Sequence, residues 1–446
     1  MTLRRREFLG RSALLTGLAL AGRTPAAPRG AARVLVIGGG FAGAACALSL
    51  RRSAPRLDVT LVDPDASYIT CPMSNEVIVG WRDIASITVS RDGLRGAGIT
   101  CVEDRAESIH AERRRVRLAA GGVLAYDRLV VAPGIRFLWD RIEGLTCETS
   151  PRMPHAWQAG AQTTLLAAQL SALRPGGVFA ISVPGGYMRC PPGPFERASL
   201  VAEYLKRRNP RAKVLIFDAN NRFPRQDAFT AAWRELYGNA VEWVPVVAGG
   251  AVSRVDAATR TLFTSSGAHP ADVACVIPPQ APAALAVQSG LASDHGWCPV
   301  VPGTFESTQV SGVHVIGDAC IADPMPKAAS AAYAQAVSCA TSIAAMLEHR
   351  RPAVRPLDSV CFSMLARGRA LAIRARFVIE DGMIRSVDDA AKRKTGLEAA
   401  GAIDAGQEAR DAEAWYRRLV ADSFGGSTSA VELAPAGTGA LDVRVR

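Results

Sequence analysis

Three cysteines occupy sequence settings that could support redox chemistry at sulfur. Cys71 lies in SYITCPMSNEVIVG, Cys190 in RCPPGPFERASLVAEYL and Cys361 in SVCFSML. A cysteine thiolate is the nucleophile of thiol–disulfide exchange, so each position is a candidate for that chemistry. Each also has a structural interpretation, because an isolated cysteine often behaves as a small buried apolar residue.

The turn that carries Cys190 is an altered nucleotide-binding turn. An apolar run, AISVPGG, reaches Gly185 and Gly186, and a helix-like segment follows. A dinucleotide-binding turn needs a third glycine and free backbone N–H groups at the start of its helix. Here Cys190 is followed by Pro191 and Pro192, and proline has no N–H to donate. We therefore expect this turn not to bind NAD(P)H.

A complete dinucleotide-binding fingerprint stands near the start of the chain. In ARVLVIGGGFAGAACALSLRRS, an apolar strand leads through Gly38, Gly40 and Gly43 into an apolar helix. The next strand, LDVTLVD, ends at Asp63, 25 residues after Gly38. This is the spacing of the acid that accepts hydrogen bonds from the adenosine ribose. The pyrophosphate is expected on the helix N-terminus, where amides and the helix dipole favour anions.

Two later segments indicate which dinucleotide binds. LAYDRLVVAPG, residues 124–134, is a predicted strand that ends in a turn of small residues. VSGVHVIGDACIADPMPKAASAAYAQA contains a strand, a turn at Gly317 and Asp318, and an alanine-rich helix. The pair resembles the two-dinucleotide-domain flavoproteins of the disulfide reductase superfamily, which implies FAD with Asp318 on its ribityl chain. The alternative role for Asp318 is a helix N-cap. The FAD-binding candidates are Gly38, Gly40, Gly43, Asp63, Gly317, Asp318 and Lys327.

The cysteine motifs carry a more specific resemblance. Together with GDACIADPMPKAASAAYAQA and AWYRRLVADSFG, they resemble the flavoprotein subunit of flavocytochrome c sulfide dehydrogenase, from the N-terminus to about residue 425. The resemblance implies that Cys190 and Cys361 form a redox-active disulfide beside the flavin. Sulfide would attack this bond and leave a persulfide on one cysteine and a thiolate on the other. A purely structural disulfide between domains is the alternative.

The same resemblance implies roles for three further residues. Glu196 is a candidate base, with a surface helix glutamate as the alternative. Cys71 matches a cysteine joined to the flavin 8α-methyl group by a thioether, although Pro72 and Met73 follow it where the family has bulkier residues. Trp415 packs near the flavin or simply in the core. Buried thiols or structural pairs are expected for Cys46, Cys101, Cys147, Cys275, Cys298, Cys320 and Cys339.

The N-terminus predicts export. RRREFLGRSALLTGLALAG has paired arginines, Arg5 and Arg6, before a short apolar run, and Ala19-Leu20-Ala21 offers a cleavage site. This pattern is typical of the twin-arginine route, and a disordered basic leader is the alternative. No later apolar run is expected to span a membrane. We therefore expect a periplasmic protein, exported folded, without stable membrane insertion.

Composition and charge are those of a globular protein with a basic surface. The 446 residues are 49% apolar and 21% charged, and the net charge of +11 is not concentrated in any block of Lys and Arg. No motif indicates a nucleic-acid partner. The predicted fold class is α/β, with two Rossmann-like domains arranged as in glutathione reductase and a C-terminal α+β domain. The predicted segments are a signal peptide (1–30), an FAD-binding domain (31–151 and 276–355), a second Rossmann-like domain (152–275), a C-terminal domain with a hairpin turn at 381–382 followed by a charged helix (356–425), and a flexible tail (426–446).

The predicted function is oxidation of sulfide, a small inorganic sulfur substrate, to sulfur or polysulfide. The resemblance implies that electrons pass through FAD to a c-type cytochrome. Because the chain has no C-x-x-C-H haem motif, the haem would belong to a separate subunit. A sulfide:quinone reductase is one alternative, and it would need an amphipathic membrane-docking segment. A non-catalytic flavin-bearing subunit is another, and it would not need both Cys190 and Cys361. The altered second fingerprint disfavours an NADH-dependent disulfide reductase.

Overall fold

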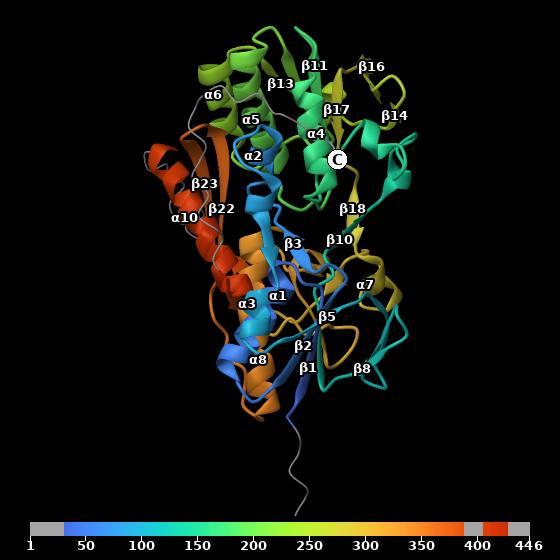
Figure 1. The fold of residues 1–446 in the computed structure, drawn as a ribbon, viewed down its shortest axis with the longest axis vertical. Helices are drawn as coiled ribbons and strands as arrows, with labels where there is room; N and C mark the ends of the chain where they lie inside the picture. The colour runs from blue at the N-terminus through green and yellow to red at the C-terminus, as the bar shows by residue number, and fades with distance from the viewer. Residues whose placement is uncertain (1–30, 388–404, 427–446) are drawn as a thin grey trace, which may run out of the picture. The chain divides into compact units, whose positions relative to one another are not determined.

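The computed structural model describes residues 31–387 and 405–426, so the predicted signal peptide and nearly all of the predicted tail lie outside the described residues. A five-stranded sheet with the order β20-β9-β1-β2-β5 forms the first layer (Figure 1). All its strand pairs are parallel. Its strands are β1 (Arg33–Ile37), β2 (Asp58–Asp63), β5 (Thr100–Glu103), β9 (Arg128–Val131) and β20 (Val313–Val315).

Two helices rich in small residues share the core of this sheet. Helices α1 (Phe41–Ser53) and α8 (Ala329–Leu347) pack against each other, and their alanines allow the backbones to approach closely. The expectation that no later run is long and apolar enough to span a membrane fails for α8 by length and composition alone, since an 18-residue window of its 19 residues has a mean hydropathy of 1.2. However, 67% of that window is buried inside the molecule, as in a core helix.

Shorter elements surround the first sheet. An antiparallel meander, β6-β7-β8, follows β5, and β3 pairs with β4. The bounds are β3 (Ser67–Ile69), α2 (Ser74–Ile78), β4 (Thr88–Ser90), α3 (Asp92–Gly96), β6 (Ala106–His110), β7 (Arg115–Leu118), β8 (Val123–Ala125), α7 (Ala284–Gln288), β19 (Cys298–Pro299) and β21 (Cys320–Ile321).

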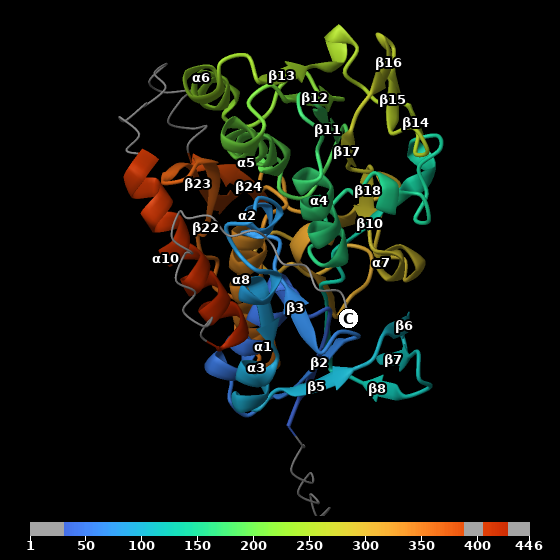
Figure 2. The same ribbon diagram turned by 45° about the horizontal axis from the view of Figure 1, so that its top comes forward.

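A second parallel sheet has the order β13-β12-β11-β17. Strands β11, β12 and β17 are mostly buried apolar runs, which is typical of parallel strands covered on both faces, whereas the edge strand β13 is only partly buried. Figure 2 shows α5 and α6 beside β23 and β22, and the β14-β15-β16 meander at the opposite edge. The bounds are α4 (Ala161–Ser171), β11 (Val178–Val183), α5 (Gly193–Arg208), β12 (Lys213–Asp218), α6 (Gln226–Tyr237), β13 (Val241–Val244), β14 (Arg254–Asp256), β15 (Thr261–Thr264), β16 (Gly267–Pro270) and β17 (Val273–Val276).

The C-terminal segment packs against helices of both sheets, chiefly α8, α1 and α5. Strands β22 (Leu357–Ala366), β23 (Arg369–Glu380) and β24 (Met383–Ser386) are antiparallel, and the β23-β24 turn is the hairpin turn expected at 381–382. Helix α10 (Ala405–Phe424) lies against β23 and α1 (Figure 1). Two antiparallel connections, β10 (Ile135–Phe137) and β18 (Gln280–Pro282), join the two sheets. The segments that carry the three cysteines are therefore brought together by tertiary packing.

Candidate active site

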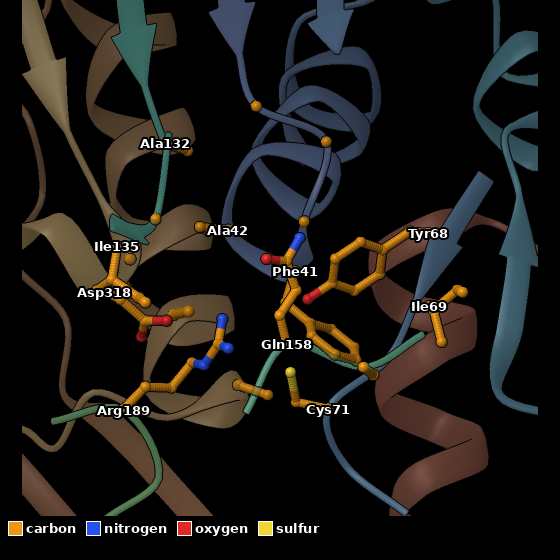
Figure 3. A pocket seen from close by; sticks show the side chains of 18 of the residues that line it. Phe41, Ala42, Tyr68, Ile69, Cys71, Ala132, Ile135, Gln158, Arg189 and Asp318 are labelled. Atoms are coloured by element: carbon orange, nitrogen blue, oxygen red, sulfur yellow. The ribbon is translucent and has the colours of Figure 1, made fainter. Parts of the chain in front are cut away.

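A large cavity lies where these segments meet. Its volume is about 930 Å³, within the range of cofactor sites, and its lining extends from the glycine turn after β1 to the three candidate cysteines. Figure 3 shows Cys71, Arg189 and Asp318 directed toward one space, with Phe41 and Tyr68 beside it. These side chains come from segments far apart in the sequence.

The glycine turn is fixed by close backbone contacts. Gly38 has a φ of +95°, and a Cβ there would lie 2.2 Å from the carbonyl oxygen of Ala132. A Cβ on Gly43 would lie 1.8 Å from the carbonyl oxygen of Gly38, so both positions require glycine. Gly40 differs, because a Cβ there would meet only the Tyr68 ring at an ordinary 3.6 Å. The open space at Gly40 leaves room for a ligand at the start of α1.

Asp63 lies beside this turn, as its spacing predicts. Its Oδ2 accepts a hydrogen bond from the Gly39 N–H at 2.5 Å, and its Oδ1 lies 3.2 Å from Nη2 of Arg91. Arg91 is only 2% exposed and also donates to the Gly39 carbonyl. The carboxylate is thus held in place, and it lines the cavity. Its contact with a ribose remains a prediction.

Asp318 lines the cavity, whereas Lys327 does not. Burial raises the pKa of Asp318, and Arg189 and Lys327 act in the opposite direction. No side-chain capping bond is formed at the short helix containing Asp318 or at α8, which argues against the N-cap alternative. Lys327 Nζ donates to the main-chain oxygens of Asp318 and Cys320, each at 2.9 Å. The structure therefore places Lys327 behind the turn that presents Asp318. Gly317, with a φ of +76°, also lines the cavity.

Cys190 occupies a constrained turn. Its φ is +52°, and its N–H donates to the carbonyl of Lys327 at 2.7 Å. A Cβ on Gly193 would lie 2.7 Å from the Trp157 ring and 3.0 Å from Cys190 Sγ, so the glycine of the motif makes room for the sulfur. Burial raises the pKa of the Cys190 thiol well above its usual value, and Cys361 and Glu196 raise it further.

Cys361 reaches the same cavity from β22. Its Sγ lies 3.7 Å from Ser330 Oγ at the start of α8, and burial raises its pKa to about 11. The ten cysteines of the chain all fall within the described residues and are free thiols. The structure thus brings Cys190 and Cys361 to one cavity, and a disulfide between them remains a prediction.

Glu196 lies in the first turn of α5, facing the cavity rather than bulk solvent. Asn75 Nδ2 donates to its Oε2 and the Met364 N–H donates to its Oε1, each at 2.9 Å. Burial raises the pKa of Glu196 from 4.5 to about 7. Its place on the cavity and its two hydrogen bonds argue against the surface-glutamate alternative, and its role as a base remains a prediction.

Cys71 and Trp415 also line the cavity. Cys71 Sγ lies 3.9 Å from the carbonyl oxygen of Trp157, and the following Met73 adopts a left-handed φ of +67° that starts α2. The Trp415 ring packs against Phe362 with centroids 5.5 Å apart. Trp415 thus combines core packing with exposure to the cavity.

The second nucleotide-type turn has no free acid. Asp218 ends β12, as Asp63 ends β2, but it is fully buried. It accepts hydrogen bonds from Trp243 Nε1 at 3.0 Å and from Asn220 N and Nδ2 at 2.9 and 2.8 Å. This supports the expectation that NAD(P)H does not bind here. Among the cysteines without a predicted role, Cys147 is exposed and Cys101 half-buried, and the buried thiols are Cys46, Cys275, Cys298, Cys320 and Cys339.

Sequence reasoning missed several residues of the site. Trp157 shields Cys190, its Nε1 donates to the Arg189 carbonyl at 3.1 Å, and its own carbonyl accepts from the Arg189 guanidinium. Asn75 orients Glu196. Asn75 and Arg189 stand close to Cys71 and Cys190 in the sequence, and this proximity was the only available signal. No sequence pattern around Trp157 indicates a role in the site.

These residues fit FAD. No side chain caps α1, and its first turn holds no acid, so its amide N–H groups are available to a pyrophosphate. One cavity is lined by Asp63, the glycine turn and the three candidate cysteines. The residues that would hold FAD are Gly38, Gly39, Gly40, Asp63 and Asp318.

Comparisons with known proteins agree with this geometry. Residues 32–164 match the family described as pyridine nucleotide-disulphide oxidoreductase. Residues 163–278 match the central region of the sulfide dehydrogenase [flavocytochrome c] flavoprotein chain. The flavoprotein chain of that name from Chlorobaculum thiosulfatiphilum is 52% identical over 48 residues, which is 11% of this chain and all of that sequence.

Sulfide:quinone oxidoreductases are also similar. The mitochondrial enzyme of Mus musculus is 22% identical over 352 residues, 77% of each chain. The sulfide-quinone reductase of Aquifex aeolicus is 32% identical over 185 residues, 41% of this chain and 42% of that one. The X-ray structure of the sulfide:quinone oxidoreductase from Aquifex aeolicus has a TM-score of 0.68 and 19% identity over 91% of this chain and 93% of that one, which shows a shared fold.

The glycine turn, the paired sheets and the matched regions lead to one conclusion. This chain belongs to the FAD-binding oxidoreductases of the pyridine nucleotide-disulphide family, within the flavoproteins that include sulfide:quinone oxidoreductases and the flavoprotein chain of flavocytochrome c.

Proposed function

We propose that this protein oxidises sulfide to sulfur or polysulfide in the periplasm and passes the electrons to a c-type cytochrome subunit. The observation that carries the proposal is that Cys190, Cys361 and Glu196 line one FAD-type cavity. They come from the turn before α5, from the first turn of α5 and from β22, and α5 contacts β22 only in the tertiary structure.

The two cysteines supply the sulfur chemistry. In the oxidised protein, HS⁻ attacks one sulfur of a Cys190–Cys361 disulfide. The bond between the cysteines breaks, a bond to the incoming sulfur forms, and the electron pair leaves on the other cysteine as a thiolate. Bound FAD supplies a two-electron acceptor that can release electrons singly. The prolines of the turn stiffen the loop that carries Cys190.

Glu196 supplies the proton chemistry. A base must be ionised at the working pH and basic enough to accept a proton, and a pKa of about 7 meets both requirements. The donors Asn75 and Met364 N–H fix both oxygens of the carboxyl group. We assign Glu196 to the removal of the proton carried by sulfide or by the persulfide.

The cytochrome acceptor rests on two features. The match to the flavocytochrome c flavoprotein chain includes the turn with Cys190, and the twin-arginine pattern predicts export of a folded flavoprotein. Attachment of FAD through Cys71, whose thiol lines the cavity, would retain the cofactor outside the cytoplasm. The second candidate is a sulfide:quinone reductase, favoured by the longer matches to enzymes of that name.

The test is an acceptor assay with the purified flavin-containing protein. Sulfide-dependent initial rates are measured with a c-type cytochrome and with a short-chain quinone. Cys190→Ser and Cys361→Ser should each lower the cytochrome rate by about 100-fold or more, whereas the exposed Cys147→Ser keeps it. Reduction of quinone alone would select the second candidate, and reduction of neither acceptor would overturn the proposal.

A further inference from the structure

Arg189 immediately precedes Cys190, and its main chain is fixed on both sides. Its N–H donates to Gln280 Oε1 at 2.9 Å, and its carbonyl oxygen accepts from Trp157 Nε1 at 3.1 Å. One guanidinium nitrogen, Nη2, donates to the carbonyl of Trp157. These contacts hold the side chain in one position on the cavity wall.

The remaining guanidinium donors face the cavity. Within residues 31–387 and 405–426, the structure gives them no hydrogen-bond or ion-pair partner, and Figure 3 shows the group between Asp318 and Cys71. The cations among the described lining residues are Arg105, Arg189 and Arg197.

The other two cations are not equivalent to Arg189. Arg197 is committed to the main-chain oxygens of His155 and Ala156 and to the Asn75 side chain. Arg105 is exposed and stands two residues beyond β5, whose last residue pairs in register with Asp63.

The groups around Arg189 are those that carry or acquire negative charge. Burial alone lowers the pKa of its guanidinium, but Cys71, Asp318, Tyr68 and Cys190 outweigh that effect and raise the pKa. In return, Arg189 acts to lower the pKa of the Cys190 thiol. Charge interactions are strong in such a site because water screens them little.

We propose that Arg189 is the cation that stabilises negative charge on the reduced flavin, and that it thereby raises the reduction potential of bound FAD. Two-electron reduction adds negative charge to the ring system, and a charge near the ring nitrogens tunes the electronics of a flavin. A guanidinium whose remaining donors face the cavity favours the reduced state. The inference rests on FAD binding and not on sulfide as the donor.

The test is the midpoint potential of the flavin, measured by equilibration with a reference dye in the absence of sulfide. Arg189→Gln keeps a donor for the Trp157 carbonyl and removes the charge. We expect it to lower the equilibrium constant for flavin reduction at least tenfold, a decrease of about 30 mV for a two-electron couple. Arg189→Lys should keep this equilibrium constant within about threefold of the wild-type value. Arg105→Met, which removes another arginine of the cavity lining, is the matched control and should also keep the equilibrium constant within about threefold of wild type.

An unchanged potential in Arg189→Gln would overturn the inference. Equal shifts in Arg189→Gln and Arg189→Lys would overturn it too, because they would show that shape rather than charge matters. If Arg189→Gln does not fold, Arg189→Met provides a second neutral side chain of similar length. Because no sulfide is present, failure of sulfide oxidation and failure of this inference are distinguishable.

Discussion

Replacement of Glu196 by Gln tests the buried carboxyl group most stringently, because its environment sets a measurable pH dependence. In the folded protein, burial raises the pKa of Glu196 from 4.5 to about 7. The folded state therefore holds this proton more tightly than the unfolded chain does. The contribution of Glu196 to the free energy of unfolding is complete below pH 4.5 and is lost as the pH rises through 7.

The magnitude follows from the difference between the two pKa values. Each pKa unit corresponds to about 1.4 kcal/mol, so ionisation of Glu196 lowers the free energy of unfolding by about 3 kcal/mol in total. Most of this loss falls between pH 5 and pH 8. Gln cannot ionise, so Glu196→Gln removes this contribution to the pH dependence. The Gln amide also faces the Asn75 amide, which adds a pH-independent offset.

The assay is urea unfolding of the flavin-containing wild type and variant at several pH values between 5 and 8. Between pH 5 and pH 8, the free energy of unfolding of wild type should fall by about 2–3 kcal/mol more than that of Glu196→Gln. Flavin reduction by sulfide should also slow by about 100-fold or more in the variant, as for loss of a general base. Parallel stability curves across this range would refute the reasoning about burial.

Three further perturbations have expected outcomes. Gly43→Ala places a Cβ 1.8 Å from the Gly38 carbonyl oxygen and should lower the free energy of unfolding, measured with urea, by about 3 kcal/mol or more. Gly96 has open space around it, so Gly96→Ala should lower the free energy of unfolding by less than about 1 kcal/mol. Cys71→Ser should release its flavin into the supernatant on acid precipitation, while wild type keeps the colour in the pellet; flavin released equally from both would contradict the thioether. Arg82 is 4% exposed and pairs with Glu76, so Arg82→Met should cost about 3–5 kcal/mol in thermal or urea unfolding by leaving a buried carboxylate unpaired. A cost below about 1 kcal/mol would show that this pair is not important for stability.

The first nucleotide fold could be predicted from the sequence because its signals are local. Gly38, Gly43 and Asp63 stand at fixed offsets within one strand–turn–helix–strand unit, and each offset reflects a backbone contact that the structure contains. The hairpin at 381–382 and the helix that ends at Phe424 are local in the same way. The length and composition of α8 do not separate a core helix from a membrane-spanning one, whereas its burial within the fold is that of a core helix.

The site depends on contacts that no local pattern reports. Glu196 has its pKa set by burial and by Asn75 and Met364, which lie more than 100 residues away in both directions. Lys327 was expected on the cofactor because of its motif, but its amine turns to main-chain oxygens behind Asp318. Arg189 was overlooked because its direction depends on the Trp157 carbonyl. The cysteine motifs indicated the location of the chemistry, and the tertiary structure supplied the charges around it.

The most direct test of the central claim is an anaerobic titration of the purified protein with sulfide, followed by the flavin absorbance. The account predicts that sulfide bleaches the oxidised flavin band of wild type and leaves it intact in Cys190→Ser. If the band persists in wild type, or is bleached equally in Cys190→Ser, then the sulfur chemistry does not pass through Cys190 and the central claim is wrong.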